Sequence, residues 1–292
     1  MTCERQWLLH YVEKLKTTME PERRARGTAF HSVMAWHFGP QVANPLGKPQ
    51  LDGYDELGPI ASLDAALVKD CGVHRRLKEE TIAAYAYWKV RNILAGYKPL
   101  WVEKEITATV AELDPAGCEG PLAYLNDEVL SIKPDLVATD GVRIRCIDHK
   151  VMGGSGDRIR PPSPDRDPWQ LAFQVLFYLH VLRLPRVQDM VGGRVEDFVI
   201  HRVKSQRPFD CALFPVAELA PMQAALPRLI RLAAAQDTKL VQRHKTGETM
   251  QPTGLLTGAC FGQWECDYVP LCTTHTDEGW QGIVEAVYAH DD

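Results

Sequence analysis

Two segments rich in β-branched residues, 129–139 and 142–149, are joined by the turn signal Thr139-Asp140-Gly141. Glycine tolerates the positive φ of a tight turn, so this pattern predicts a β-hairpin of two neighbouring strands. The hairpin puts Lys133-Pro134-Asp135 in the middle of the first strand and Asp148 at the end of the second. A fold built around it must therefore hold two carboxylates on adjacent strands of a sheet.

A lysine accompanies the second carboxylate in Asp148-His149-Lys150. Side chains two residues apart face the same side of a strand, so Asp148 and Lys150 share a face and His149 points to the other. Buried unpaired charges are costly, which makes a bound cation the natural partner of the carboxylates, and oxygen ligands favour Mg²⁺ or Mn²⁺. Such an ion can activate a water molecule and stabilise a phosphate oxygen, and Lys150 can assist the attack.

The rest of the chain alternates between helical and strand-like patterns. Apolar spacing predicts helices over residues 3–17, 27–38, 59–96, 168–183 and 215–245. Thr28 is a candidate N-cap of the second of these helices, and the Gly- and Pro-rich residues 151–168 are expected to form a loop. Besides the hairpin, strands are predicted over 100–110 and 195–203.

This order of elements predicts one α/β domain over residues 1–292, with a mixed central sheet flanked by helices. Its expected parts are a mainly helical region (1–98), a catalytic α/β core (99–205), and a C-terminal helix with a cysteine segment (206–292). A chain of 292 residues is long enough to bury a full hydrophobic core.

The composition excludes several classes of protein. Hydrophobic residues make up 45% and charged residues 24%, which excludes wholesale disorder. No apolar run approaches the roughly 20 residues that cross a bilayer, and the first residues do not resemble a signal peptide, so we expect a cytoplasmic protein. A formal net charge of −5 excludes a strongly basic nucleic-acid coat protein but leaves a local basic groove open.

The eight cysteines are unevenly placed. Cys260, Cys266 and Cys272 are clustered, whereas Cys3 stands alone near the other end. Eight are too few for a disulfide scaffold of this length, and clustered thiols in the cytosol indicate metal or redox chemistry. Structural zinc usually uses C-x2–4-C pairs, which this sequence lacks. The scattered cysteines are expected to be small buried residues: Cys71, Cys118, Cys146 and Cys211.

Several of these motifs carry a family resemblance. Pro134-Asp135 followed by Asp148-His149-Lys150 resembles the PD-(D/E)xK nuclease signature. Gly27-Thr28-Ala29-Phe30-His31 is similar to the G-T-x-x-H helix of the RecB-type branch, in which the His is a metal ligand. Gln174-Val175-Leu176-Phe177-Tyr178 matches the Q-x-x-x-Y helix of that branch, and Glu103 stands where its first core strand often begins with V-E.

The resemblance implies a restriction-endonuclease-like core that hydrolyses DNA phosphodiester bonds with Mg²⁺ or Mn²⁺. The metal ligands that it implies are His31, Asp135, Asp148 and the backbone carbonyl of His149. The catalytic residues that it implies are Asp135, Asp148, Lys150, Gln174 and Tyr178. Among these, Gln174 and Tyr178 would orient the substrate or the metal ligands.

The cysteines carry a further resemblance, to the iron–sulfur staple of RecB-family exonucleases, of the AddB helicase–nuclease subunit and of CRISPR adaptation nucleases. Those proteins combine one early cysteine with three late ones, often as C-x2-C-x5-C, whereas the first spacing here is five. The resemblance implies a 4Fe–4S cluster held by Cys3, Cys260, Cys266 and Cys272. Such a cluster would tie the first helix to the C-terminal segment.

The RecB-type resemblance favours an exonuclease on single-stranded DNA or DNA ends, active in recombination, repair or phage DNA processing. A helicase or a recombination protein would be its partner, and no membrane is involved. Two other functions stay open, a CRISPR-type adaptation nuclease and a non-catalytic DNA-binding module that retains the fold. Intact Asp135, Asp148 and Lys150 argue against the module.

Plainer interpretations of single residues stay open as well. His31 has apolar neighbours and could be a hydrogen-bonded core histidine. Gln174 and Tyr178 are one helical turn apart, which ordinary helix amphipathicity also explains. Glu103 alternates with apolar residues, which favours a solvated strand face, although this glutamate could still help to bind metal.

Overall fold

The computed structural model describes residues 15–17, 22–42, 75–152, 159, 173–216, 220–247 and 288–290. The chain divides into two compact units, one of residues 21–231 and one that combines residues 1–20 with 232–292. No helix in the described ranges is both long enough and apolar enough to cross a lipid bilayer.

The larger unit is built on a five-stranded sheet in the order β2-β5-β6-β7-β8. Its strands are β2 (Lys98–Val102), β5 (Leu136–Thr139), β6 (Ile144–Met152), β7 (Val195–Lys204) and β8 (Asp210–Val216). β6 and β7 are parallel and the other neighbours are antiparallel. The expected mixed sheet is therefore confirmed, and the parallel pair lies at its centre.

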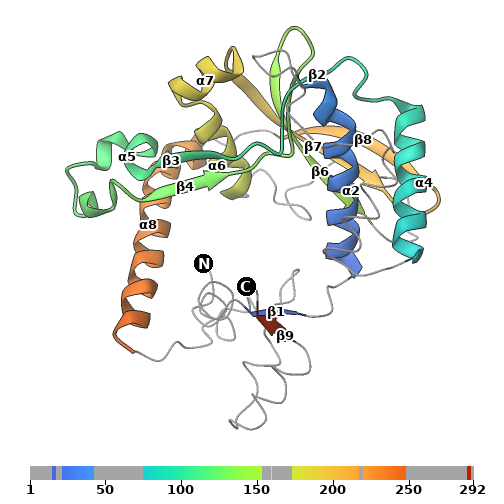
Figure 1. Ribbon diagram of the computed structural model, residues 1–292. Helices are drawn as coiled ribbons and strands as arrows, with labels where there is room; N and C mark the ends of the chain where they lie inside the picture. The colour runs from blue at the N-terminus through green and yellow to red at the C-terminus, as the bar shows by residue number, and fades with distance from the viewer. Residues whose placement is uncertain are drawn as a thin grey trace. The chain divides into compact units, whose positions relative to one another are not determined.

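Helices cover both faces of this sheet (Figure 1). On one face lie α2 (Glu22–Phe38), followed by a short 3-10 turn (Gly39–Gln41), and α4 (Arg75–Arg91). They share a buried core with alternate strand residues such as Ile147, Val199 and Val203. On the other face lie α6 (Phe173–Leu182) and α7 (Pro185–Val191), where Tyr178 contacts Phe198. Period-two alternation along the strands thus separates the two helical layers.

Residues 106–132 form an arm that leaves the sheet between β2 and β5 (Figure 1). Its strands β3 (Ile106–Thr109) and β4 (Val129–Ile132) pair antiparallel. Between them stand α5 (Val110–Leu113) and two 3-10 turns (Pro115–Gly117 and Ala123–Leu125). A capping box of Thr109 and Glu112 begins α5.

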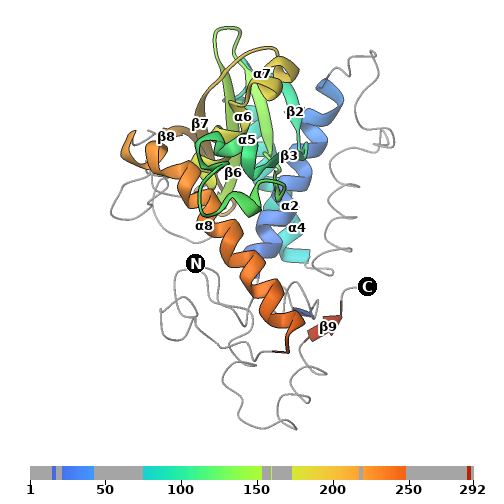
Figure 2. The same cartoon turned by 90° about the vertical axis from the view of Figure 1, so that its left-hand side faces the viewer.

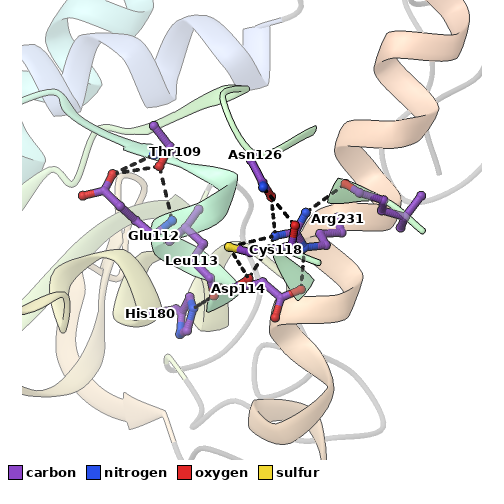
Figure 3. Close-up of polar contacts among 9 residues, drawn as sticks. Thr109, Glu112, Leu113, Asp114, Cys118, Asn126, His180 and Arg231 are labelled. Carbon is purple, nitrogen blue, oxygen red and sulfur yellow. Dashed lines mark hydrogen bonds and ion pairs between the residues drawn. The ribbon is translucent and has the colours of Figure 1, made fainter. Parts of the chain in front are cut away.

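Arg231 of α8 (Ala220–Lys245) holds the arm in place (Figure 3). Its side chain is 3% exposed. Its guanidinium donates to Asp114 Oδ2 at 2.7 Å, to the Leu122 carbonyl at 2.9 Å and to Asn126 Oδ1 at 2.9 Å. A buried arginine with this many acceptors is fully engaged, so the arm is fastened to the first part of α8.

Two further helices also hold the arm. His180 of α6 lies with Nε2 2.7 Å from the Leu113 carbonyl. Arg186 of α7 donates to Glu112 Oε1 at 2.6 Å and also to the Thr107 carbonyl.

The smaller unit contains an antiparallel pair of short strands, β1 (Leu15–Thr17) and β9 (Tyr288–His290). Figure 2 shows β9 in a view turned by 90° from that of Figure 1. Residues 15–17 were predicted to end a helix, and that prediction is wrong. Their pairing with β9 decides the conformation, since a three-residue segment has little intrinsic preference of its own.

The central hairpin is confirmed, but its first strand is not continuous. Gly141 has a φ of 89°, and Asp140 Oδ1 accepts the N–H groups of Val142 and Arg143, which closes the turn. Lys133-Pro134-Asp135 was expected in mid-strand and instead separates β4 from β5. Pro134 has no N–H to donate to a ladder, so the chain passes here from the arm to the central sheet.

Other expected elements differ at their bounds. Thr28 lies inside α2 and is not an N-cap, and the single strand expected over 100–110 is divided into β2 and β3. Neither β8 nor α7 was predicted, and α8 begins at Ala220. Cys146 and Cys211 are buried as expected, whereas Cys118 is partly exposed. Cys71 lies outside the described residues.

Candidate metal centre

The candidate site lies where the β5–β6 ladder ends. Its last paired residues are Leu136 and Ile147, so Asp135 precedes β5 and Asp148 and His149 follow along β6. The backbone N–H of His149 donates to Oδ2 of Asp135 at 2.7 Å. The carboxylate thus takes the place of the strand partner that β5 no longer supplies, and this contact fixes Asp135 beside β6.

α2 brings His31 to the same place. Its Nε2 lies 2.6 Å from the carbonyl oxygen of His149, and its Nδ1 lies 3.3 Å from Oδ1 of Asp135. The carbonyl and the carboxylate can only accept hydrogen bonds, which favours protons on both ring nitrogens of His31. To ligate an ion, His31 would give up one of these protons. Burial alone would lower the pKa of His31, but the hydrogen bond and the charge of Asp135 raise it to about 9.

The two carboxylates are in opposite electrostatic environments. Burial works against a low pKa for Asp135, but the hydrogen bond and charge of His31 lower that pKa to about 2. For Asp148, burial and the neighbouring charge of Asp135 raise the pKa to about 6, although Lys150 acts in the other direction. A buried carboxylate disfavoured as an anion fits a place where a cation would neutralise it.

Lys150 shares the face of Asp148, as the two-residue spacing predicts. Its Nζ lies 3.1 Å from Oδ1 and 2.9 Å from Oδ2 of Asp148. The lysine side chain is 28% exposed and the aspartate side chain 7%, so the ammonium group stands between the buried carboxylate and solvent. This position suits a group that meets a negatively charged substrate.

Glu103 belongs to the site, although the sequence favoured a solvated strand face for it. It follows β2 with a φ of 48°, and its N–H donates to the Asp135 carbonyl at 3.2 Å. Its carboxylate is 2.8 Å from Lys133 Nζ. A non-glycine residue at positive φ is uncommon. The V-E match was the only sequence signal for it, because the break between β2 and β3 that turns Glu103 inward is not visible in the pattern.

Gln174 and Tyr178 act on Asp135 indirectly, through the backbone of the segment that precedes it. The Tyr178 hydroxyl donates to the Lys133 carbonyl at 3.3 Å, two residues before Asp135. The Gln174 side chain is hydrogen-bonded to Tyr178, one helical turn away. Burial raises the pKa of Tyr178, so the phenol stays protonated as a donor. The pair therefore anchors the chain that carries the first carboxylate.

The His149 side chain lies on the other face of β6 from Asp148 and Lys150, as the alternation along a strand predicts, and its ring meets the His31 ring edge to face at 6.2 Å. Its Nδ1 lies 2.7 Å from Nδ1 of His201 in β7. Burial lowers the pKa of His149 to about 3 and that of His201 well below its usual value, so both rings are neutral. His149 therefore offers its backbone carbonyl to the site and its imidazole to the core.

The donor set fits a hard divalent ion. Ligand atoms of His31, Glu103 and Asp135 lie within 4.8 Å of one another, and the His149 carbonyl adjoins His31. Carboxylate and carbonyl oxygens are the ligands that Mg²⁺ and Mn²⁺ prefer. Within the described ranges this group does not include Asp148, whose carboxylate is bonded to Lys150.

The predicted cluster ligands cannot be placed in the same way. Cys3, Cys260, Cys266 and Cys272 all lie outside the described residues.

Comparison with known proteins identifies a family that the whole fold region matches. The sequence profile of the PD-(D/E)XK nuclease superfamily matches residues 1–273. A crystal structure of a candidate exonuclease from Eubacterium rectale is similar over 82% of this chain and 86% of that chain, with 13% identity and a TM-score of 0.38. No curated protein matches the chain.

Proposed function

Because this chain belongs to the PD-(D/E)XK nuclease superfamily, we propose that it is a Mg²⁺- or Mn²⁺-dependent deoxyribonuclease. The observation that carries the proposal is the convergence of His31, Asp135 and the His149 carbonyl beside the Asp148–Lys150 pair. The sequence motifs further favour an exonuclease on single-stranded DNA or DNA ends. A helicase or recombination protein is the kind of partner that such an enzyme has.

Each residue of the candidate metal centre would have a role in hydrolysis. His31, Asp135, Asp148 and the His149 carbonyl would hold the ion, with Glu103 beside them. A divalent ion bound there supplies Lewis acidity toward the phosphate and an acidified water molecule. Lys150, 2.9 Å from Asp148, would donate to the phosphate oxygen that gains charge during the attack. Tyr178 and Gln174 would keep Asp135 in place through the Lys133 carbonyl.

Removal of the ion tests the enzymatic proposal. We expect end-labelled linear single-stranded DNA to be degraded in Mg²⁺ or Mn²⁺ and to stay intact in EDTA, because the carboxylates cannot activate water without a cation. Circular and end-blocked substrates serve as controls, and their survival would identify an exonuclease. Binding of DNA without degradation in any divalent metal would instead favour the non-catalytic module. Cleavage restricted to short spacer-like duplexes would favour the CRISPR-type alternative.

We also propose that Cys3, Cys260, Cys266 and Cys272 hold a 4Fe–4S cluster with a structural role. The pairing of β1 with β9, which joins segments near the two ends of the chain, supports a staple in that region. Protein purified without oxygen is expected to be brown and to contain about four iron atoms per chain. Stoichiometric zinc in a colourless protein would contradict this assignment.

A further inference from the structure

His149 is the residue at which three contacts of the candidate site meet. Its N–H donates to Asp135 Oδ2 at 2.7 Å, and its carbonyl accepts from His31 Nε2 at 2.6 Å. On the face of the sheet that α2 and α4 cover, its ring contacts His201, with the two Nδ1 atoms 2.7 Å apart. The placement of His149 therefore affects two of the groups that would hold the ion.

The two imidazoles are neighbours inside the core. His149 and His201 are register partners on β6 and β7 and are 2% and 0% exposed. The rings of Phe30 and Trp88 lie 6.4 and 6.1 Å from His201, and the Phe38 ring lies 6.4 Å from His149. Burying an imidazole among apolar rings is costly unless its nitrogens are hydrogen-bonded. The bond between the rings therefore fixes how both are turned.

The direction of this hydrogen bond follows from the surroundings of His201. Within the described part of the chain, its Nε2 is buried without a hydrogen-bond partner. A buried N–H with no acceptor is rarer in proteins than an unfilled acceptor. We therefore assign the proton of His201 to Nδ1, from which it is donated to Nδ1 of His149.

We propose that His201 is a positioning residue of the metal centre. By donating to the His149 ring, it holds the residue whose N–H and carbonyl face Asp135 and His31. The proposal rests on the proposed function, because it gives His201 a part in holding the ion there. His201 itself would touch neither the ion nor DNA, since it is fully buried beside the rings of Phe30 and Trp88.

The test measures Mn²⁺ binding by the full chain with calorimetry. His201→Leu removes the donor and keeps an apolar side chain, and we expect the dissociation constant to rise about tenfold, as for other residues that orient metal ligands. His201→Asn keeps a donor near the position of Nδ1 and is expected to restore most of the affinity. His201→Gln places its amide near the position of Nε2 and is expected to behave like His201→Leu.

A matched control separates positioning from stability. Val203 lies on the same face of β7 as His201, is 0% exposed and pairs with Val151. Val203→Ala leaves a cavity and is expected to lower the urea midpoint of unfolding without changing Mn²⁺ affinity.

Equal Mn²⁺ affinity in wild type and His201→Leu would overturn the positioning role and leave the nuclease proposal standing. If His201→Leu fails to fold, His201→Asn and His201→Gln decide, because equal affinities of these two would also overturn the role. A wild-type protein that binds no Mn²⁺ would overturn both proposals together.

Discussion

Replacing Asp148 by Asn is expected to reduce kcat for DNA hydrolysis by about 1,000-fold while leaving the protein folded. The amide keeps the shape of the carboxylate but loses the charge that would hold the divalent ion. Burial and the charge of Asp135 already disfavour the Asp148 anion. The neutral variant is therefore expected to be at least as stable as wild type in urea. Single-turnover degradation of labelled DNA, together with urea unfolding, measures both quantities.

Asp197→Asn is the matched control for this substitution. Asp197 also lies on the central sheet, burial also raises its pKa, and it is paired with Arg145 at 3.4 Å. It lies away from Asp148 along the sheet, since Asp197 aligns with Arg145, whereas Asp148 aligns with Ile200. This variant is expected to cut DNA at the wild-type rate. Undiminished cleavage by Asp148→Asn would show that the site has been assigned to the wrong residues.

Loss of the Arg231 side chain is expected to have the largest effect on stability. Arg231→Met leaves the Asp114 carboxylate and the Asn126 amide without their cation, in a place where Arg231 itself is 3% exposed. Removing one partner of a buried ion pair costs about 3–5 kcal/mol. Urea unfolding of the variant measures this cost. Arg228→Met, at an exposed position of the same helix, is the control and is expected to change stability by less than about 0.5 kcal/mol.

Gly117 offers an independent test of the same contact. A Cβ at this position would lie 2.2 Å from Arg231 Nε and 2.3 Å from Asp114 Oδ2. Gly117→Ala must therefore separate the two charged groups and is expected to reproduce most of the loss seen in Arg231→Met. Gly120→Ala is the control, because its Cβ would meet only a carbonyl oxygen at 3.5 Å. A Gly117→Ala protein as stable as wild type would contradict this account of the contact.

Local signals made part of the site predictable from the sequence. The turn at Asp140-Gly141 fixes the β5–β6 hairpin, and the spacing of Asp148 and Lys150 fixes their common face. These features depend on residues that are close in the chain. The break at Pro134 was not predicted, because the β-branched residues on both sides of it are typical of one continuous strand. The arm that ends at this break has no periodic sequence pattern of its own.

Contacts between distant segments were not predictable in the same way. His201 meets His149 only because β6 and β7 are parallel and in one particular register. Arg231 meets Asp114 across a separation in sequence of 117 residues. The sequence around His201 or Arg231 contains no signal that identifies the distant partner. Local patterns and propensities alone therefore cannot predict these contacts.

The attachment of the arm affects how it opens to solvent. A two-stranded hairpin is only marginally stable by itself in water. The arm is nevertheless hydrogen-bonded to three helices, through His180, Arg186 and Arg231. Its amide protons should therefore exchange with deuterium at rates set by the opening of those helices, and the arm and the helices should lose their protection as one cooperative unit.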